Sequence, residues 1–492
     1  MKAIGDQRAA AGPATPDHQA RMRYAWRVCS VTSLGLILIG VAGSTLNVAL
    51  PSVVRHFHAS AMESGWILLS FLLVNTASLV FFGRVADLVG RREVYLTGLA
   101  LFTAASLLAG LAPDVWFLVG MRVVQAVGAA MVLANGTVIL TDAFPPERLS
   151  QGMGVYIGTL SVAQLAGPTL GGLIAETAGW QWIFWVNVPA GLAALTWGAM
   201  TLRRMPRGPR RPVDALGNAL LFAALSALLL ALSEAGSAGL SSPAVIGGAA
   251  VFVVLVPVTV LVERRAASPV LDLRLLGGRL LTCANLASFC NALARSALIL
   301  IAALYFQAVR GLDAFDAGLS VLPLPVGMAL ASPAAGLLGR RVSSYALSVG
   351  GALLSAAGLG VLMLAIDPAA PYWIIGLGLL VAGCGSGAFM TGNTTEVMRA
   401  VPQSSLGVVN GLRMMIMNVG IVISVGLSLS VLTSSVDEHL RAQVSAGTLS
   451  ALSPVAVGQL TQGFGRTYAV LLAVALAGLA LAALARAPKE PR

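Results

Sequence analysis

The chain has 492 residues, of which 57% are hydrophobic and only 10% charged, and its mean hydropathy is +0.85. Soluble domains carry about 25% charged residues, so this composition excludes a soluble globular protein and indicates an integral membrane protein. The net charge of +11 does not indicate nucleic acid in such a chain. We attribute it to arginine-rich cytoplasmic segments that face anionic lipid.

The N-terminal 28 residues are polar and carry Pro13, Pro16 and scattered charges, so we expect a cytoplasmic tail there. They lack the apolar core that a cleaved signal peptide requires. The four cysteines fall in apolar segments without C-x-x-C spacing, which favours small buried side chains over disulfides or metal ligands. They are Cys29, Cys283, Cys290 and Cys384. We therefore expect neither a metal site nor a cofactor.

Apolar runs of helical length dominate the rest of the chain. About 20 such residues span a bilayer as a helix, and the alternating pattern of a membrane β-barrel is absent. The pattern predicts an all-α membrane protein with about fourteen spans. These are expected at 29–51, 64–83, 93–111, 115–141, 150–175, 181–202, 214–233, 244–262, 281–307, 316–338, 345–366, 372–395, 405–432 and 466–486.

Lysine and arginine placement predicts the orientation. With the N-terminus inside, the inside segments hold 24 of the 31 basic residues, the outside loops hold 4, and 3 lie within spans. Positive charge concentrates on the cytoplasmic side, so both termini are expected in the cytoplasm. We divide the chain into a six-helix half (29–204), two additional helices (205–265), a second six-helix half (266–486) with an extracellular loop at 433–464, and a short cytoplasmic tail (487–492).

The first three spans carry two features that suggest function. In the first span, Gly40, Ser44 and Asn47 share a helix face, as expected for a helix that lines a cavity. Between the second and third spans, residues 83–92 have the pattern G-x-x-x-D-x-x-G-R-R, which predicts a charged loop outside the bilayer. Its Asp87 can pair with arginines or cap a helix N-terminus. The alternative is a segment that only sets topology.

Arg122 lies about two turns into the fourth span, with Gln125 one turn further on the same face. A charge at this depth costs roughly 2.5–3.5 kcal/mol on insertion scales, so it should face protein or a wet cavity. Two interpretations remain open. The side chain either faces a wet cavity or is tied to neighbouring backbone carbonyls.

In the fifth span, Ala163, Gly167 and Gly171 recur at four-residue spacing, and Pro168 allows a local bend. Small residues at this spacing permit close helix packing. A plain packing interface and a gate are both consistent with this pattern.

Polar residues also interrupt two spans of the second half. Arg295 lies near the middle of the ninth span, with Ser288 and Asn291 on the same face. Such a polar stripe on an apolar helix predicts the wall of a central cavity. In the thirteenth span, Arg413 follows Asn410 by one turn. The pair has two possible roles, hydrogen bonding within the helix bundle and contact with a ligand.

Several of these segments together resemble a known family. The 83–92 pattern is similar to the loop between the second and third helices of major facilitator transporters. Leu118–Gly128 resembles that family's l-x-x-x-R-x-x-Q-G-x-G motif, and Gly167–Gly172 resembles the antiporter motif G-P-x-x-G-G. Trp180–Gly191 looks like the W-R-W-I-F-x-x-N-x-P-x-G signature of the fourteen-helix drug:proton antiporters of the EmrB/QacA type. Weaker similarities follow at 304–307, 317–323 and 407–413.

The resemblance implies a secondary transporter that is not an enzyme. It implies export of drugs or amphipathic small molecules from a bacterial cytoplasmic membrane by alternating access between the halves, with protons as the coupling ion and with antibiotic resistance as the outcome. The expected partners are the substrate and the lipid bilayer, and the chain is expected to be a monomer. Nucleic acid is not expected. ATP is not expected either, because the chain has no G-x-x-x-x-G-K-[ST] loop.

Eight polar residues are the expected lining of the substrate cavity. The 83–92 segment is expected to act as a conformational motif, and Gly167, Pro168, Gly171 and Gly172 as a gating motif. The cavity residues are Asn47, Arg122, Gln125, Gln164, Asn291, Arg295, Asn410 and Arg413, and the conformational motif comprises Gly83, Asp87, Gly90, Arg91 and Arg92.

One departure from the family pattern affects the driving force. The family's first-helix motif, D-x-T-x-x-N-V-A-L-P, aligns on Asn47–Pro51 and puts Ala42 at the aspartate position. No acidic residue falls at a span centre, and all four histidines lie outside the spans. Proton coupling would then need a peripheral group such as Asp87, Asp142 or Glu396.

The missing carboxylate keeps other functions open. With three intramembrane arginines and no central acid, the cavity is expected to be positive and to favour neutral or anionic substrates over cations. A facilitator or exporter of one neutral or anionic metabolite without standard coupling is one alternative. A membrane receptor that does not transport is another. A membrane enzyme would need clustered catalytic side chains, and the sequence shows none.

Overall fold

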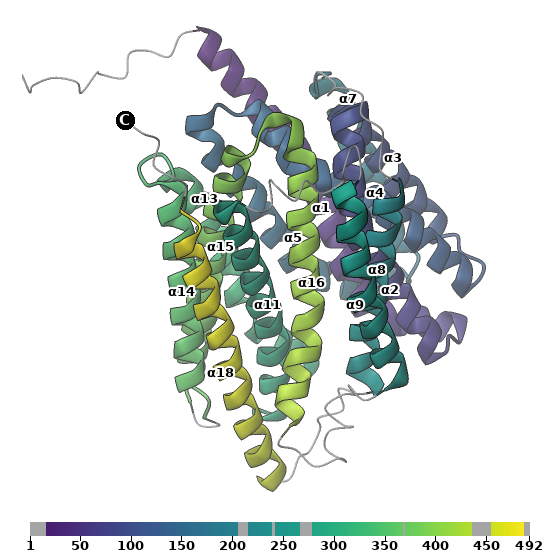
Figure 1. Cartoon of the computed structure of the whole chain (residues 1–492). Helices are drawn as coiled ribbons and strands as arrows, with labels where there is room; N and C mark the ends of the chain where they lie inside the picture. Colours follow the sequence, from purple (N-terminus) through teal and green to yellow (C-terminus); the bar gives the residue numbers. More distant parts are fainter. Residues whose placement is uncertain are drawn as a thin grey trace, which may run out of the picture.

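A computed structural model describes residues 16–204, 215–238, 242–265, 278–367, 370–434 and 454–486. Within these ranges the regular structure is helical, and no strand occurs. The helices pack side by side as a bundle whose axes run roughly parallel to one another (Figure 1). Twelve of the described helical segments are long and apolar enough to cross a membrane.

The N-terminal half consists of the helices up to α7. Its sixth predicted span is two helices, α6 and α7, which meet at Val186. The bounds are α1 Pro16–Phe57, α2 Ala61–Val89, α3 Arg91–Ala109, α4 Val115–Ala143, the 3₁₀ turn η1 Pro146–Arg148, α5 Leu149–Thr177, α6 Trp182–Trp185 and α7 Asn187–Thr201.

Two further helices, α8 (Ala215–Ala238) and α9 (Pro243–Arg265), precede the C-terminal half. In that half the second predicted span is also broken, because Pro323 starts a new helix after α12. The bounds are α11 Arg279–Ala308, α12 Ala314–Ser320, α13 Pro323–Leu338, α14 Ser344–Leu364, α15 Tyr372–Ala400, the 3₁₀ turn η2 Gln403–Ser405, α16 Leu406–Thr433 and α18 Pro454–Leu484.

The structure has helices at all fourteen predicted spans, but only twelve described segments qualify as membrane spans by length and hydropathy. The two that do not are α3 and α8. The helix α3 begins with the charged residues Arg91, Arg92 and Glu93, which lower its apolar content. The count of fourteen therefore stays a prediction.

Two predicted non-helical segments are partly helical. The N-terminal tail was expected to extend to residue 28, but α1 begins at Pro16. Trp26 packs edge-on against Phe144 at 5.3 Å between ring centroids. The loop expected at 433–464 is shorter, because α18 already begins at Pro454; residues 435–453 lie outside the described ranges.

The two halves meet through two pairs of helices. The helix α2 packs against α16, and α5 packs against α13, with smaller contacts of α4 with α16 and of α5 with α15. The helices α3, α7, α14 and α18 lie at the outside of their own halves. On one side of the bundle α8 contacts both α2 and α16, and α9 packs on α8.

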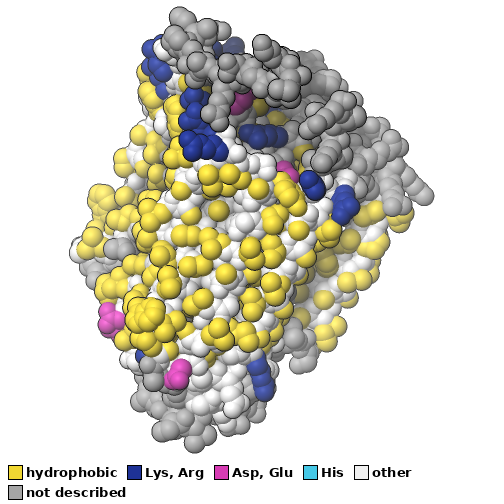
Figure 2. Space-filling view, turned by 90° about the vertical axis from the view of Figure 1, so that its left-hand side faces the viewer, with side chains coloured by type: hydrophobic (Ala, Val, Ile, Leu, Met, Phe, Trp, Pro, Cys, Tyr) yellow, Lys and Arg dark blue, Asp and Glu magenta, His cyan; other side chains and the backbone are white. Residues whose placement is uncertain are grey.

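Both ends of the described chain lie at the same end of the bundle, the top in Figure 1. We call this end the termini face. Seen from the side, the middle of the molecule is a broad hydrophobic band, and Lys and Arg side chains gather near the termini face (Figure 2). This distribution is typical of a protein that spans a bilayer, because lipid surrounds the apolar band and water solvates the charged ends.

Candidate functional site

The charged segment at residues 83–92 is not a loop. The helix α2 continues to Val89 and α3 starts at Arg91, so only Gly90 lies between them. Gly90 has a φ of +125°, a conformation that glycine adopts readily because it has no Cβ. One residue therefore reverses the chain, and the prediction of a ten-residue loop was wrong in this respect.

Three side chains form a charge cluster at this turn: Asp87, Arg91 and Asp142. Arg91 donates to Asp87 Oδ1 from Nε at 3.2 Å and from Nη2 at 3.0 Å. Its Nη1 donates to Asp142 Oδ2, near the end of α4, at 2.5 Å. Among the described residues these are the only ion pairs. The cluster joins α2, α3 and α4 on the termini face.

The charge cluster also contacts the second half. Asp87 lies against the first turn of α16, where a Cβ on Gly407 would come within 2.8 and 2.9 Å of its two carboxylate oxygens. Backbone N–H groups in the first turn of a helix lack intrahelical partners and favour a negative charge. Gly83 and Gly407 pack backbone to backbone, so a Cβ on Gly83 would collide with the Gly407 carbonyl.

Two arginines reach across from one half to the other, and we call these the crossing arginines. Arg91 Nη2 donates to the carbonyl of Gln403 in η2, just before α16. Arg399, at the end of α15, donates from Nη2 to the carbonyl of Pro146 in η1, just before α5. Each half thus holds the turn that precedes an interface helix of the other half.

Below these bonds, further polar contacts join the halves. Asn410 Nδ2 donates to the carbonyls of Leu133 and Ala134 in α4, at 3.3 and 2.8 Å. Nearer the middle of α16, Asn418 donates to Thr76 Oγ1 in α2 at 3.1 Å. The described contact between the halves is therefore closed at the termini face, and these hydrogen bonds add to the close helix packing and the buried apolar cluster of α2, α4 and α16.

The α5–α13 contact is built from small residues. A Cβ on Gly154 would collide with the carbonyl of Ser332, and one on Gly158 would lie 3.0 Å from Pro333 Cγ. These glycines are spaced by four residues on α5 and let its backbone approach α13 closely. The sequence analysis did not single them out.

The predicted gating motif lies elsewhere on α5. A Cβ on Gly167 would collide with Ser44, and one on Gly171 would lie 2.8 Å from Thr45 Cα, both in α1 of the same half. Gly172 has room, with Val48 at 3.7 Å, and Pro168 lies within the unbroken α5. This geometry favours the packing interpretation over a gate between the halves.

The helix face of α1 that was predicted to line a cavity is mostly covered by α5. Gly40 and Ser44 pack against α5, because a Cβ on Gly40 would lie 2.9 Å from Ala163 Cβ and Ser44 abuts Gly167. Asn47 is exposed, and Gln164 is half-buried in α5.

Arg122 is tied to its own half. Its Nη1 donates to Gln125 Oε1 at 2.6 Å, its Nε donates to the Ile67 carbonyl at 3.3 Å, and its guanidinium lies 4.3 Å from the centroid of the Phe71 ring. Gln125 in turn donates to Ser106 at 2.8 Å. This network favours the interpretation that Arg122 is tied to backbone carbonyls.

The two arginines of the second half differ in their surroundings. Arg413 is 1% exposed and donates from Nη2 to Thr394 Oγ1 of α15 at 2.5 Å. Arg295, near the middle of α11, is also buried. Its stripe neighbours Ser288 and Asn291 donate to Asn393 and Ser386 of α15, at 2.8 and 3.3 Å.

The eight predicted cavity residues do not form one group. Arg122 and Gln125 belong to the N-terminal half, Asn291 and Arg295 lie in α11, and Asn410 and Arg413 lie in α16, where Asn410 joins the halves. Contact of any of them with a substrate stays a prediction. Arg92 completes the conformational motif by donating to the Leu202 carbonyl at 2.7 Å, which fixes α3 to the end of α7.

Sequence reasoning missed Arg399 and Gln403. Arg399 follows a long apolar stretch and precedes Pro402, a position that indicates only the end of a span. Gln403 takes part through its backbone carbonyl, which any residue type would offer. The spacing of Gly154 and Gly158, by contrast, is a signal that the sequence does contain.

Comparison with known proteins identifies the family of this chain. Residues 32–425 match the model of the Major Facilitator Superfamily. The multidrug resistance protein Stp of Mycobacterium tuberculosis is 32% identical over 392 residues, which cover 77% of this chain and 71% of that protein. The riboflavin transporter RibZ of Clostridioides difficile is 28% identical over 388 residues, or 78% and 83% of the two chains.

A further relative is the tetracenomycin C resistance and export protein of Streptomyces glaucescens, which is 29% identical over 80% of this chain and 73% of its own length. Among solved structures, the human organic anion transporter MFSD10 aligns with a TM-score of 0.65 at 16% identity, over 93% of this chain and 99% of that one. That likeness concerns the fold. The chain belongs to the major facilitator superfamily, whose members are membrane transporters and not enzymes.

Proposed function

We propose that this protein exports drugs or other amphipathic small molecules across a bacterial cytoplasmic membrane by alternating access. In this proposal the chain has fourteen transmembrane helices and both termini lie in the cytoplasm, so the termini face is the cytoplasmic face. The sequence motifs of the fourteen-helix drug:proton antiporters support the proposal. So do relatives whose names state multidrug resistance and tetracenomycin C export.

The observation that carries the proposal is the closed contact at the termini face. It combines a buried apolar cluster of α2, α4 and α16 with individual bonds between the halves: the crossing arginines on Gln403 and Pro146, and Asn410 on α4. Separate hydrogen bonds, each with a net stabilisation of about 1 kcal/mol, can break together when the halves rock about a central site.

The charge cluster is where we place proton coupling. Ala42 occupies the family's aspartate position and is buried, so the first helix offers no carboxylate there. Asp87 and Asp142 share one counter-ion, Arg91. A proton on Asp87 removes its attraction to Arg91 and weakens its contact with the first turn of α16, which favours a negative charge. Protonation and opening of the termini face are then linked.

A second candidate function is uncoupled transport of one metabolite. The buried Ala42 favours it, and the riboflavin transporter among the relatives shows that a specific metabolite is one kind of cargo in proteins similar to this chain.

Transport in proteoliposomes with an imposed pH gradient separates these functions. We expect purified protein to move the neutral amphiphile methyl pyrenebutyrate faster with the gradient than without it, relative to protein-free vesicles. Equal flux with and without the gradient would remove proton coupling and leave the uncoupled carrier. Binding without flux would overturn transport and leave the receptor.

A further inference from the structure

Arg295 is a charge buried at membrane depth. It lies near the middle of α11, roughly 24 Å from the start of the helix at 1.5 Å per residue, and only 6% of its surface is exposed. A guanidinium stays charged in proteins and offers five N–H donors. At this depth such a charge is costly unless it is paired.

The described structure gives Arg295 no partner. Its Nε is fully buried and has no hydrogen-bond acceptor, and the guanidinium makes no ion pair with a described residue. The other two arginines predicted to lie within spans are different. Arg122 is bonded to Gln125 and to a carbonyl, and Arg413 is bonded to Thr394.

The polar residues beside Arg295 do not compensate it. Ser288 and Asn291 precede it on the same helix face, and each donates to a side chain of α15. They are donors to Asn393 and Ser386, so this stripe holds α11 against α15. Arg295, the next residue on the stripe, is left with its donors unused.

Arg295 forms no ion pair with a described carboxylate. The acids that form ion pairs, Asp87 and Asp142, are both held by Arg91 at the termini face. The family's aspartate position in the first helix is Ala42. A buried cation with free donors in a low-dielectric setting favours an anion, and two N–H groups of a guanidinium match the two oxygens of a carboxylate.

We infer that Arg295 binds the anionic group, a carboxylate or an anion of similar shape, of the amphiphile that this protein transports. This inference rests on the proposed transport function and names its substrate class. The apolar part of the substrate then lies against the hydrophobic side chains of the bundle, and Arg295 selects for charge. Cations are disfavoured because a second unpaired cation would be buried beside the first.

Three matched fluorescent probes test this charge selection. They are pyrenebutyrate, its methyl ester and a pyrene of the same chain length that ends in a trimethylammonium group. Binding to the detergent-solubilised full chain is measured by energy transfer from tryptophan to pyrene and corrected with protein-free micelles. We expect the carboxylate to bind at least tenfold more tightly than the ester, which is about 1.4 kcal/mol, and the cation to bind most weakly.

Arg295→Gln should remove this preference by weakening carboxylate binding about tenfold, while ester binding stays unchanged and reports that the protein is folded. Arg295→Lys, which keeps the charge, should retain part of the preference. The matched control is Arg340→Gln, the same substitution at an exposed position of the termini face, and it should behave as the parent.

Two results would overturn the inference. One is equal binding of carboxylate and ester by the parent, and the other is a carboxylate preference that survives in Arg295→Gln. Either result leaves methyl pyrenebutyrate transport, and with it the proposed function, intact. If Arg295→Gln fails to fold, Arg295→Lys decides, because loss of all carboxylate preference in a folded lysine variant contradicts a role for charge.

Discussion

Individual side chains at the termini face both compensate charge within one half and form hydrogen bonds to the other half. Arg91 is the clearest case. It pairs with Asp87 and Asp142 in its own half and also donates to the Gln403 carbonyl of the second half. Removing it leaves two largely buried carboxylates without their ion-pair partner, and breaking a buried pair by removing one partner is costly.

Arg91→Ala should therefore destabilise the closed termini face by about 3 kcal/mol. A reporter is Ser332→Cys, in a background without the native cysteines, because Ser332 is completely buried in the α5–α13 contact. We expect a water-soluble maleimide to label it more than tenfold faster in Arg91→Ala. Arg341→Ala, at an exposed position of the same face, is the control. An unchanged labelling rate in Arg91→Ala would show that the charge cluster does not hold the face closed.

Asn410→Ala should have a smaller effect in the same direction. It removes the hydrogen bonds to Leu133 and Ala134, worth about 1 kcal/mol net, so labelling of the Ser332→Cys reporter should rise about fivefold. Asn187→Ala is the matched control, since Asn187 donates at 3.0 Å to Ile183 within one half and its loss should not change the rate. Equal rates in the two variants would contradict a role for Asn410 between the halves.

Some residue-scale features could be predicted from the sequence and others could not. The charge of Asp87 and Arg91 and the burial of Arg122 follow from type and position in an apolar chain. Which intramembrane arginine lacks a partner follows only in part. Gln125 lies on the same helix as Arg122, but the Ile67 carbonyl and the Phe71 ring come from another helix. The Gln403 carbonyl carries no side-chain signal at all.

At the scale of helices, glycines decide how closely the halves approach. Gly83 in α2 and Gly407 in α16 leave no room for a side chain at their crossing, and Gly154 and Gly158 do the same between α5 and α13. Close approach is what brings donors on one helix within reach of carbonyls on the other.

Gly83→Ala should force α2 away from α16, because its Cβ would collide with the Gly407 carbonyl, which belongs to the backbone and cannot turn aside. We expect methyl pyrenebutyrate transport to fall at least fivefold and the Ser332→Cys reporter to label faster. Gly120→Ala meets open space in α4 and should keep full transport, with slightly higher thermal stability from the better helix former. Normal transport by Gly83→Ala would contradict the close crossing.

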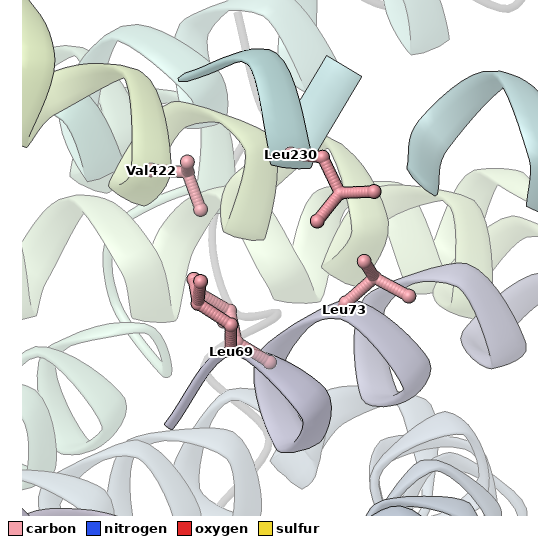
Figure 3. A pocket seen from close by; sticks show the side chains of 5 residues that line it. Leu69, Leu73, Leu230 and Val422 are labelled. Carbon is pink, nitrogen blue, oxygen red and sulfur yellow. The ribbon is translucent and has the colours of Figure 1, made fainter. Parts of the chain in front are cut away.

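The helix α8 lies over the seam where α2 and α16 meet. A small hollow between the three helices is lined by Leu69, Leu72 and Leu73 of α2, Leu230 of α8 and Val422 of α16 (Figure 3). All five side chains are aliphatic, so this hollow offers no group that could hold a charge. Because α8 touches both halves, the proposed alternating access would require it to slide on at least one of them.

Element boundaries were predictable only where charge or proline marks them. The start of α13 at Pro323 is such a case, and the break at Val186 is not. The conformational motif was predicted as a loop because three arginines and an aspartate were assigned to water. In the structure the charges compensate one another, and the helix continues to Val89 with a turn of one glycine.

On the scale of the whole molecule, the fold was predictable because long apolar runs leave few alternatives to a helical membrane bundle. The pairing of α2 with α16 and of α5 with α13 was not, since it joins segments more than 150 residues apart whose contact surfaces are small residues. The orientation rests on the distribution of Lys and Arg, and Figure 2 shows such side chains near the termini face.

Single-cysteine labelling on intact cells tests that orientation. Arg55→Cys lies at the end of α1, opposite the termini face, and Glu147→Cys lies in η1 on the termini face; both positions are exposed. In a background without native cysteines, a membrane-impermeant maleimide should label the first and not the second until the membrane is opened. The reverse pattern would place both termini outside.

The crossing arginines have a consequence for the tightness of the membrane seal. Arg91 belongs to one half and Arg399 to the other. Each donates a hydrogen bond to the turn that precedes an interface helix of the other half. A tilt of the halves that breaks only one of these two hydrogen bonds would strain the other. In the proposed transport cycle, both contacts would therefore have to break in one step when the termini face opens. A carrier that does not populate partly open conformations avoids an ion leak through a pathway that is open on both sides of the membrane.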